Sequence, residues 1–129
     1  MTAWTIDELN KIGRAEELQI ASLRRDGTLR NPVTIWVVCV GDALYVRAYK
    51  GRTSAWFRHA LVRREGHIHA GGVDKEVIFI EESNPAINDQ IDAVYRAKYR
   101  SHDAQYVDPM VSPEAKAATI KLASRSTDS

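Results

Sequence analysis

Cysteine is almost missing from this sequence, which contains a single one, Cys39. One thiol cannot form a disulfide within the chain, and sparse cysteine is typical of a reducing compartment, so we expect a cytoplasmic protein. Cys39 lies in an apolar run with no basic neighbour to activate it. A small buried core residue is therefore favoured over a catalytic or redox thiol.

Long apolar runs and a charge excess are missing as well. No run is long enough to cross a bilayer, and the first residues, MTAWTIDELNKIG, lack the apolar core of a signal peptide. The net charge of +1 gives no reason to expect a membrane or a nucleic acid as the main partner. A local basic cluster is only weak support for nucleic-acid binding; it comprises Arg24, Arg25, Arg30, Arg63 and Arg64.

Several catalytic motifs are also absent. The sequence has no glycine-rich phosphate loop, no Gly-x-Ser-x-Gly motif and no suggestively spaced pair of carboxylates, so hydrolysis and phosphoryl transfer have no support. His67 and His69 would point the same way on a strand, but no third ligand is spaced with them. We therefore expect surface or interface histidines and no metal.

What is present suits one soluble domain. The hydrophobic fraction of 44% and the charged fraction of 27% are ordinary for a globular protein, and 129 residues can bury a sizeable core. We expect a single domain over residues 1–123 and a flexible C-terminal tail over 124–129.

Two hairpins dominate the predicted sheet. Asp26-Gly27 predicts a type I′ turn that places Ile20 opposite Val33 and Leu18 opposite Ile35, with an edge, a bulge or a strand start near Pro32. Gly41-Asp42 suits a type II′ turn between two β-branched runs. Its register pairs Val40 with Ala43, Val38 with Tyr45, Trp36 with Arg47, and Thr34 with Tyr49.

The strand over residues 33–40 is apolar on both faces. One face should line a barrel, and the predicted inner set is Leu18, Ile20, Val33, Ile35 and Val37. The other face, with Thr34, Trp36, Arg47 and Tyr49, must lie under a helix, a ligand or a second subunit. A basic loop, Lys50-Gly51-Arg52-Thr53-Ser54, then enters a helix that contains Trp56. An aromatic wall beside such a loop suits a flat ligand with an anionic tail.

The remaining elements follow from caps and spacing. We expect a helix with a Thr5–Glu8 capping box that stops at Gly13, and a helix over about 55–63. A hairpin spans 66–72 and 75–80, and Ser83-Asn84-Pro85 is a helix start, with Pro85 suited to the first turn of a helix that runs to about Tyr99. Residues 100–112 should be loop, followed by one helical turn near 113–117 and a last strand over 118–122. Tyr106 and His102 either form a lid over the ligand or belong to a segment packed on the barrel, which is favoured.

The stretches NPVTIWVVCVGDALYVRAYKG and SAWFRHAL resemble the core of the FMN-binding split β-barrels, which include pyridoxamine-phosphate-oxidase-like proteins and deazaflavin-dependent nitroreductases. Together with IDAVYRAKY and ATIKL, most of residues 4–122 is more similar still to a small bacterial family of unknown function, number 2255. The resemblance implies an α+β fold, mainly antiparallel: a six-stranded split β-barrel with flanking helices. It also implies a homodimer with a cofactor at the subunit interface.

In that superfamily, residues on two strands and the following loop contact the flavin ring and phosphate. The expected cofactor-binding residues here are Thr34, Trp36, Arg47, Tyr49, Lys50, Gly51, Arg52, Thr53, Ser54 and Trp56. Where the nitroreductase branch favours Lys-Ser-Gly, this chain has Arg25-Asp26-Gly27, and the acidic residue should weaken phosphate binding there.

The sequence therefore leaves two functions open. The first is a flavin-binding oxidoreductase that acts on a small molecule, with FMN as the cofactor and a deazaflavin, or no cofactor, as alternatives. The second is a non-enzymatic split-barrel module for ligand binding or protein interaction, because the fold by itself does not supply an activity.

Overall fold

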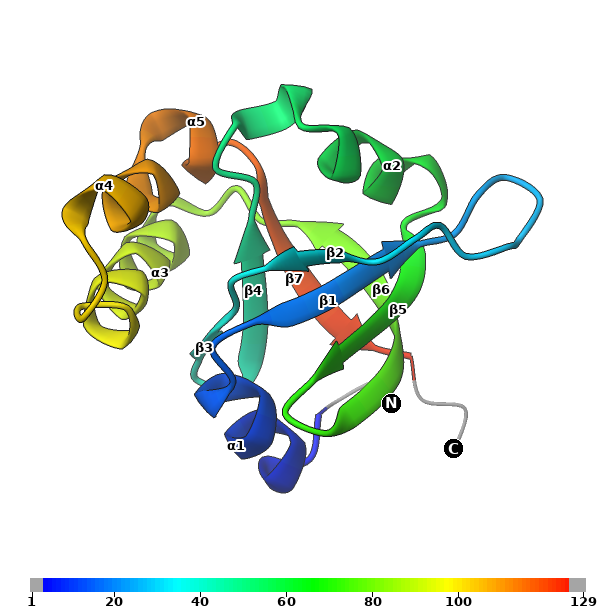
Figure 1. Cartoon of the computed structure of the whole chain (residues 1–129), viewed down its shortest axis with the longest axis horizontal. Helices are drawn as coiled ribbons and strands as arrows, with labels where there is room; N and C mark the ends of the chain where they lie inside the picture. Colours follow the sequence, from blue (N-terminus) through cyan, green and yellow to red (C-terminus); the bar gives the residue numbers. More distant parts are fainter. Residues whose placement is uncertain (1–3, 126–129) are drawn as a thin grey trace.

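Seven antiparallel strands form one curled sheet in the computed structural model of the protein, which describes residues 4–125 (Figure 1). The order across the sheet is β2-β1-β5-β6-β7-β4-β3. The sheet curls into a half-barrel with helices on its outside, and the predicted α+β class is confirmed. The strands are β1 (Leu18–Ser22), β2 (Val33–Ile35), β3 (Val38–Val40), β4 (Ala43–Arg47), β5 (Glu65–Ala70), β6 (Val73–Glu81) and β7 (Thr119–Ser124).

The seventh strand arises because the predicted strand over 33–40 breaks in two. β2 pairs with β1 on one edge of the sheet, and β3 pairs with β4 on the other. At the break, the Val37 N–H donates to the Tyr99 hydroxyl at 3.2 Å, and the Val37 carbonyl accepts from Lys98 Nζ at 2.6 Å. Side chains from a helix therefore satisfy backbone groups that a continuous strand would have used in the sheet.

Both hairpin registers are confirmed over part of their length. Leu18 pairs with Ile35 and Ile20 with Val33. Beyond Gly41-Asp42, Val38 pairs with Tyr45 and Val40 with Ala43. The predicted pairs Trp36–Arg47 and Thr34–Tyr49 are wrong, because the strand has already broken: Arg47 pairs with Thr119 of β7.

The β1–β2 connection reaches its register by a different route from the one predicted. The Arg24 N–H donates to the Thr28 carbonyl at 2.7 Å, which makes a three-residue turn with Gly27 at φ 89°. Between the Leu23–Leu29 bridge and the Ile20–Val33 pair, the first arm of the hairpin has two residues and the second arm has three. This bulge lies at the expected place, near Pro32, and it restores the register.

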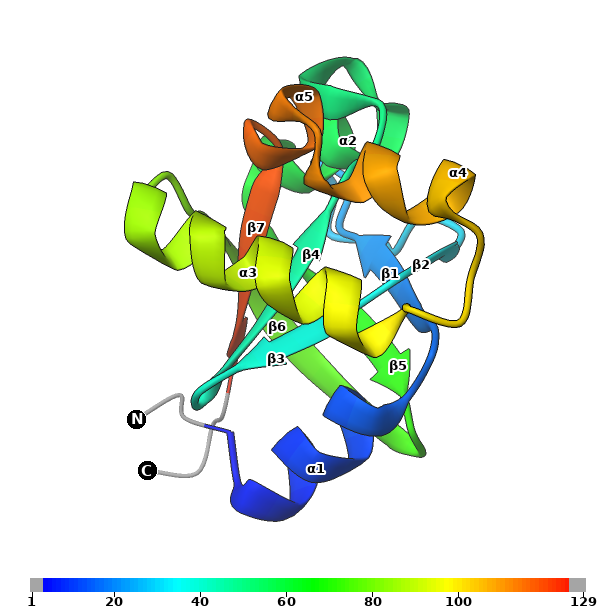
Figure 2. The same cartoon turned by 90° about the vertical axis from the view of Figure 1, so that its left-hand side faces the viewer.

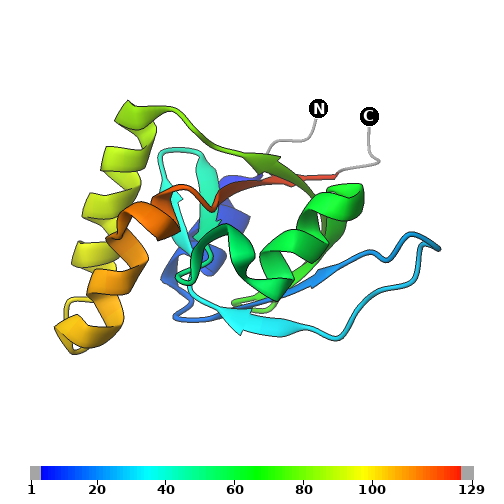
Figure 3. The same cartoon turned by 90° about the horizontal axis from the view of Figure 1, so that it is seen from above.

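Five α-helices and two 3₁₀ turns surround the sheet: α1 (Ile6–Arg14), η1 (Gly51–Thr53), α2 (Ala55–Arg63), α3 (Pro85–Lys98), α4 (Ala104–Val107), η2 (Asp108–Val111) and α5 (Pro113–Lys116). The Thr5–Glu8 capping box and the Asn84 cap of α3 form as predicted. The expected loop over 100–112 instead contains α4 and η2. Seen from above, α2 and α3 cover different sides of the sheet (Figure 3).

The sheet and its helices bury two apolar layers, one in the barrel interior and one between the sheet and α3. The barrel interior contains Leu18, Ile20 and Val37 from the predicted inner set. Ile35 is half-buried and packs against the same core, as predicted. Val33 is 40% exposed, so its prediction is wrong, because β2 is an edge strand. In Figure 2, α3 crosses the outer face of β3 and β4, where Ile91, Tyr95 and Tyr99 join the second layer.

The C-terminal strand is longer than expected. β7 runs to Ser124, which is buried and pairs with Val77. The predicted tail over 124–129 thus begins inside a strand, and its residues 126–129 lie outside the described range.

Candidate ligand-binding site

A cavity of about 590 Å³ lies beside the strand break, and we call it the Trp36 cavity. It is bounded by β2, the end of β4, the start of α2 and the α4–η2 segment. Its volume is within the range of roughly 300–1,000 Å³ that is usual for small-molecule sites. The lining is largely aromatic and aliphatic: Val33, Thr34, Ile35, Trp36, Arg47, Tyr49, Lys50, Ser54, Trp56, Gln105, Tyr106, Pro109 and Met110.

The strand break creates this cavity. β2 and β3 follow each other in sequence but lie on opposite edges of the sheet. Within residues 4–125, the outer edge of β2 has no strand partner. Val33, Thr34 and Ile35 line the cavity from that edge, so free backbone N–H and C=O groups lie next to the space.

Trp36 is held in place from outside the barrel. Its ring stacks on Tyr99 with centroids 3.8 Å apart and planes 3° from parallel. His102 lies 5.0 Å from the same ring and its Nε2 contacts Glu16 at 2.6 Å. The Tyr99 hydroxyl also lies 2.6 Å from the Glu16 carbonyl. One face of the indole is therefore fixed before any ligand binds.

Arg47 lies at the base of the cavity, and its guanidinium is fully used inside the protein. Nε donates to Thr119 Oγ1 at 2.9 Å, and one terminal nitrogen donates to Asp92 and to the Met110 carbonyl. The other terminal nitrogen donates to the carbonyl and the side-chain oxygen of Asn88 at 3.1 and 2.8 Å. All five donors have partners, so Arg47 joins β4, β7, α3 and η2 and has no donor left for a phosphate.

The basic loop divides between two sides of the molecule. Lys50 and Ser54 line the Trp36 cavity, with Lys50 Nζ 5.7 Å from the centre of the Tyr49 ring. Arg52 turns away from it, donates to Glu81 and the Ala117 carbonyl, and lines a separate polar cavity. Gly51 has a φ of 82° and packs against Glu114, and Thr53 is exposed.

The structure thus brings seven expected residues together around the cavity: Thr34, Trp36, Arg47, Tyr49, Lys50, Ser54 and Trp56. The α4–η2 side of the cavity is the part that sequence reasoning missed. Tyr106, which is 59% exposed, and Gln105 come from a segment expected to be loop. The only indication in the sequence that this segment borders the site was the alternative that Tyr106 forms a lid. The nearby Tyr95 and Tyr99 do not reach the cavity and are buried in the second apolar layer.

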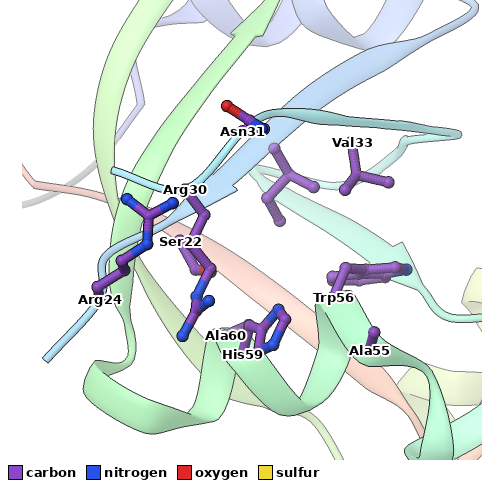
Figure 4. Close-up of a pocket in the computed structure, with 10 residues that line it drawn as sticks. Ser22, Arg24, Arg30, Asn31, Val33, Ala55, Trp56, His59 and Ala60 are labelled. Atoms are coloured by element: carbon purple, nitrogen blue, oxygen red, sulfur yellow. The ribbon is translucent and has the colours of Figure 1, made fainter. Parts of the chain in front are cut away.

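A second cavity of about 290 Å³ lies on the other side of Trp56, and we call it the Arg30 cavity (Figure 4). The two cavities share Val33 and Trp56 in their linings. In Figure 4 the Arg30 side chain extends from the β1–β2 connection to α2, next to His59. Burial and the charges of Arg30, Arg58 and Arg24 lower the pKa of His59 below its usual value.

The remaining reactive side chains form no comparable site. His67 and His69 both contact Asp74 Oδ1, at 3.2 and 2.9 Å, and no group of three metal-binding side chains occurs within residues 4–125. Cys39 is half-buried, and burial raises the pKa of its thiol. None of the helices in the described part of the chain is long and apolar enough to cross a membrane.

The curled antiparallel sheet, the outer helix layer and the cavity at the strand break define a split β-barrel protein. The chain belongs to the bacterial family of uncharacterised conserved proteins known as DUF2255, whose model matches residues 8–122. The resemblance seen in the sequence is thereby confirmed.

Two solved structures support the fold. The conserved hypothetical protein Rv2991 from Mycobacterium tuberculosis superposes with a TM-score of 0.67 at 10% identity, over 97% of this chain and 83% of that one. An F420 reductase superposes with a TM-score of 0.56 at 16% identity, over 90% of both chains. A comparison with curated proteins found no match. At these identities the likeness establishes the fold alone.

Proposed function

We propose that the Trp36 cavity binds the planar ring of a deazaflavin or flavin and that the protein is an oxidoreductase acting on a small molecule. The observation that carries this proposal is the meeting of Trp36, Tyr49, Trp56 and Tyr106 around one cavity of about 590 Å³. A largely apolar space with a few polar groups at its edge is typical of a site for a flat heterocycle. When bound, such a cofactor supplies the hydride chemistry, and the protein supplies position and electrostatics.

The residues around the cavity suit separate parts of such a ligand. Trp36 is already fixed by Tyr99 and suits stacking on one face of the ring. The Thr34 hydroxyl and the free edge of β2 offer donors and acceptors to the polar rim of the ring. Lys50 and the Ser54 hydroxyl, which makes no capping bond to α2, suit an anionic tail.

Deazaflavin is the cofactor we favour, and FMN is the alternative. The support is the fold shared with an F420 reductase, together with the cavity. Arg47 and Arg52, the two arginines expected to hold the FMN phosphate, both donate to groups of the protein instead.

The use of Arg47 and Arg52 inside the protein also favours a second candidate function, a split-barrel module that binds a ligand without redox chemistry. Arg52 lies outside the cavity and Arg47 lines it with every donor already used, so Lys50 is the cationic side chain of the expected set that remains to meet a ligand. Such a module would bind a flat, weakly charged molecule through aromatic contacts.

Titration of the purified protein with FMN, F420 and their dephosphorylated riboflavin-type forms tests both candidates. Quenching of cofactor fluorescence and thermal shift report binding, and the visible spectrum of the untreated protein reports a retained cofactor. We expect Lys50→Gln to weaken binding of the phosphorylated forms by several-fold and to leave the dephosphorylated forms unchanged. Lys121→Gln, on β7, is the matched control. Failure of all four compounds to bind contradicts the cofactor proposal and leaves the ligand-binding module.

The open edge of β2 supports a further part of the proposal, that two copies of the chain pair as a homodimer over the mouth of the Trp36 cavity. Val33, Tyr49 and Tyr106 are 40%, 55% and 59% exposed there. Apolar side chains that gather at a cavity mouth suit burial against a partner.

A further inference from the structure

Three side chains at and just beyond the C-terminal end of α3 hold the connection between α1 and β1. Lys98 Nζ donates to the Ala15 carbonyl at 2.6 Å. The Tyr99 hydroxyl donates to the Glu16 carbonyl, also at 2.6 Å. His102 follows in the turn after α3, and its Nε2 contacts the Glu16 carboxylate at 2.6 Å across 86 positions of sequence. In Figure 2 the end of α3 lies beside this connection.

The same end of α3 also holds Trp36, which forms one wall of the Trp36 cavity. Tyr99 stacks on the indole at 3.8 Å, and the His102 ring lies 5.0 Å from it at an angle of 51°. Lys98 Nζ donates to the carbonyl of Val37, the next residue of the strand break, at 2.6 Å. The groups that hold the α1–β1 connection are therefore the groups that hold the cavity wall.

The contact between Glu16 and His102 depends on charge, and we call these two residues the Glu16–His102 pair. A carboxylate only accepts hydrogen bonds, so His102 Nε2 is the donor. The contact is an ion pair only when the imidazole is protonated. Histidine side chains commonly change charge between about pH 5 and 8. The imidazole and the carboxylate are 32% and 63% exposed, so protonation should strengthen the contact by a modest amount.

The other charges near this imidazole come from its own segment and from the connection that it contacts. Arg100 and Asp103 flank it in the chain with opposite charges, and Glu17 follows its partner. Lys98 Nζ is already held by two backbone carbonyls. The aromatic rings that face the imidazole are uncharged, and burial raises the pKa of the Tyr99 hydroxyl above its usual value. The protonated ring therefore has its carboxylate partner in the connection before β1.

We propose that His102 is a positioning residue for the Trp36 cavity, which holds the indole in place through Glu16 and holds it best when the imidazole is protonated. A wall that is fixed in advance lowers the ordering cost of binding a flat ring. Affinity for such a ring should therefore increase as the pH falls from about 8.5 to 6. The effect on affinity rests on the proposed function, whereas the hold on Trp36 exists without any ligand.

The indole N–H signal of Trp36 in NMR spectra of the ligand-free full chain tests the hold itself. Trp36→Phe assigns this signal among the three indoles of the chain. We expect the signal to move between pH 8.5 and 6, and we expect His102→Gln and Glu16→Gln each to remove most of that movement. His102→Arg keeps a planar cation at every pH, so its signal should stay near the low-pH position.

Riboflavin binding tests the consequence for the site. Riboflavin lacks the phosphate of FMN, whose own titration would overlap this pH range. The parent chain should bind it about two- to fivefold more tightly at pH 6 than at pH 8.5, as a partly exposed ion pair allows. His102→Gln should lose that difference, and His102→Arg should bind tightly at both pH values. A pH dependence that persists in His102→Gln at full size contradicts the proposal and points to another group, such as His59.

His69→Gln is the matched control. His69 also contacts a carboxylate, Asp74 at 2.9 Å, but it lies on β5 and outside the lining of the Trp36 cavity. This change should alter neither the Trp36 signal nor riboflavin affinity, and amide spectra of all variants report folding. If riboflavin binds at no pH, the ring site fails and the indole signal alone decides on the hold. The proposal is overturned if that signal follows pH equally in the parent, His102→Gln and Glu16→Gln, or if His69→Gln changes it as much as His102→Gln does.

Discussion

Arg47 is the residue on which most of the polar interior depends. Its side chain is fully buried beside an Asp92 side chain that is 20% exposed, and it donates to groups of β7, α3 and η2. Asp92 keeps a second ion pair, with Lys116 at 2.8 Å. Removing the guanidinium nevertheless leaves the buried acceptors of Thr119, Asn88 and Met110 without their donor, at about 1–3 kcal/mol for each unsatisfied group and about 3–5 kcal/mol together. We therefore expect Arg47→Met to lower the free energy of unfolding by that amount in urea denaturation.

Arg96 provides the matched control for this change. It forms a single ion pair with Asp108, and both side chains are more than half exposed. Arg96→Met should alter stability by less than about 0.5 kcal/mol. An equal and small effect of the two substitutions would contradict the role assigned to Arg47. A binding defect in an Arg47 variant is no evidence for cofactor contact, because the variant disturbs the cavity base itself.

Lys98 should give stability a pH dependence of its own. Its Nζ donates to the Ala15 and Val37 carbonyls, and burial lowers its pKa from 10.5 to about 8. Between these values the unfolded chain binds more protons than the folded chain, so the contribution of Lys98 to stability rises with pH. Below pH 8 the cost of the buried charge is present in full.

The measurement is the difference in free energy of unfolding between the parent chain and Lys98→Met at a series of pH values. Both chains carry Cys39→Ala, which removes the titration of the nearby thiol. The difference should move in favour of the parent from pH about 8 to about 10. A flat difference for Lys98→Met would show that its pKa is not lowered.

At the scale of the element, Gly66 sets how closely β5 packs in the barrel. A Cβ at this position would lie 2.2 Å from the Ala21 carbonyl oxygen and 2.7 Å from the Phe79 ring. Because the first of these contacts is backbone, Gly66→Ala must shift β1 or β5, and we expect a loss of about 2 kcal/mol or more by denaturation.

Gly41 provides the comparison for this substitution. It has a φ of 63° in the β3–β4 turn, with open space where a Cβ would lie. Gly41→Asn should cost less than Gly66→Ala, because Asn tolerates the left-handed region. If Gly41→Asn costs more stability than Gly66→Ala, the conformation of the β3–β4 turn limits the stability of the sheet more than the packing of β5 does.

The hairpins were predictable because their information is local. Gly41-Asp42 fixes Val38 opposite Tyr45, and the capping residues Thr5 and Asn84 fix two helix starts within one turn. The strand break at Trp36-Val37 was not predictable, since it depends on Lys98 and Tyr99, more than 60 residues away in sequence. An uninterrupted apolar run gives no local sign that its backbone bonds will change partners.

The candidate site was partly predictable for the same reason. Thr34, Trp36, Tyr49 and Trp56 are close in sequence and meet around one cavity, although the strand pairing that was expected to align them does not form. The roles of Arg47 and Arg52 were not predictable, because their acceptors on α3, β6 and α5 lie far along the chain. The covered outer face was correctly inferred, and α3 covers most of it while the Thr34 end remains open as the cavity.

At the scale of the whole molecule, the two unpaired edges of the sheet differ in exposure. Val38 of β3 is fully buried, in the layer beneath α3. Val33 of β2 is 40% exposed, on a strand whose outer edge has no strand partner within residues 4–125. An exposed apolar edge strand invites pairing with a second chain. The proposed homodimer should therefore depend on β2.

Val33→Lys tests this dependence, because a charge on the edge strand opposes pairing. We expect the parent chain to sediment as a dimer and Val33→Lys to sediment as a monomer at the same concentration. Val62→Lys is the matched control, since Val62 is also 40% exposed but lies on α2. A parent chain that is monomeric at all concentrations contradicts the dimer. If Val33→Lys and Val62→Lys dissociate the dimer equally, the interface lies over α2 instead, and the Trp36 cavity then opens to solvent in the assembled protein.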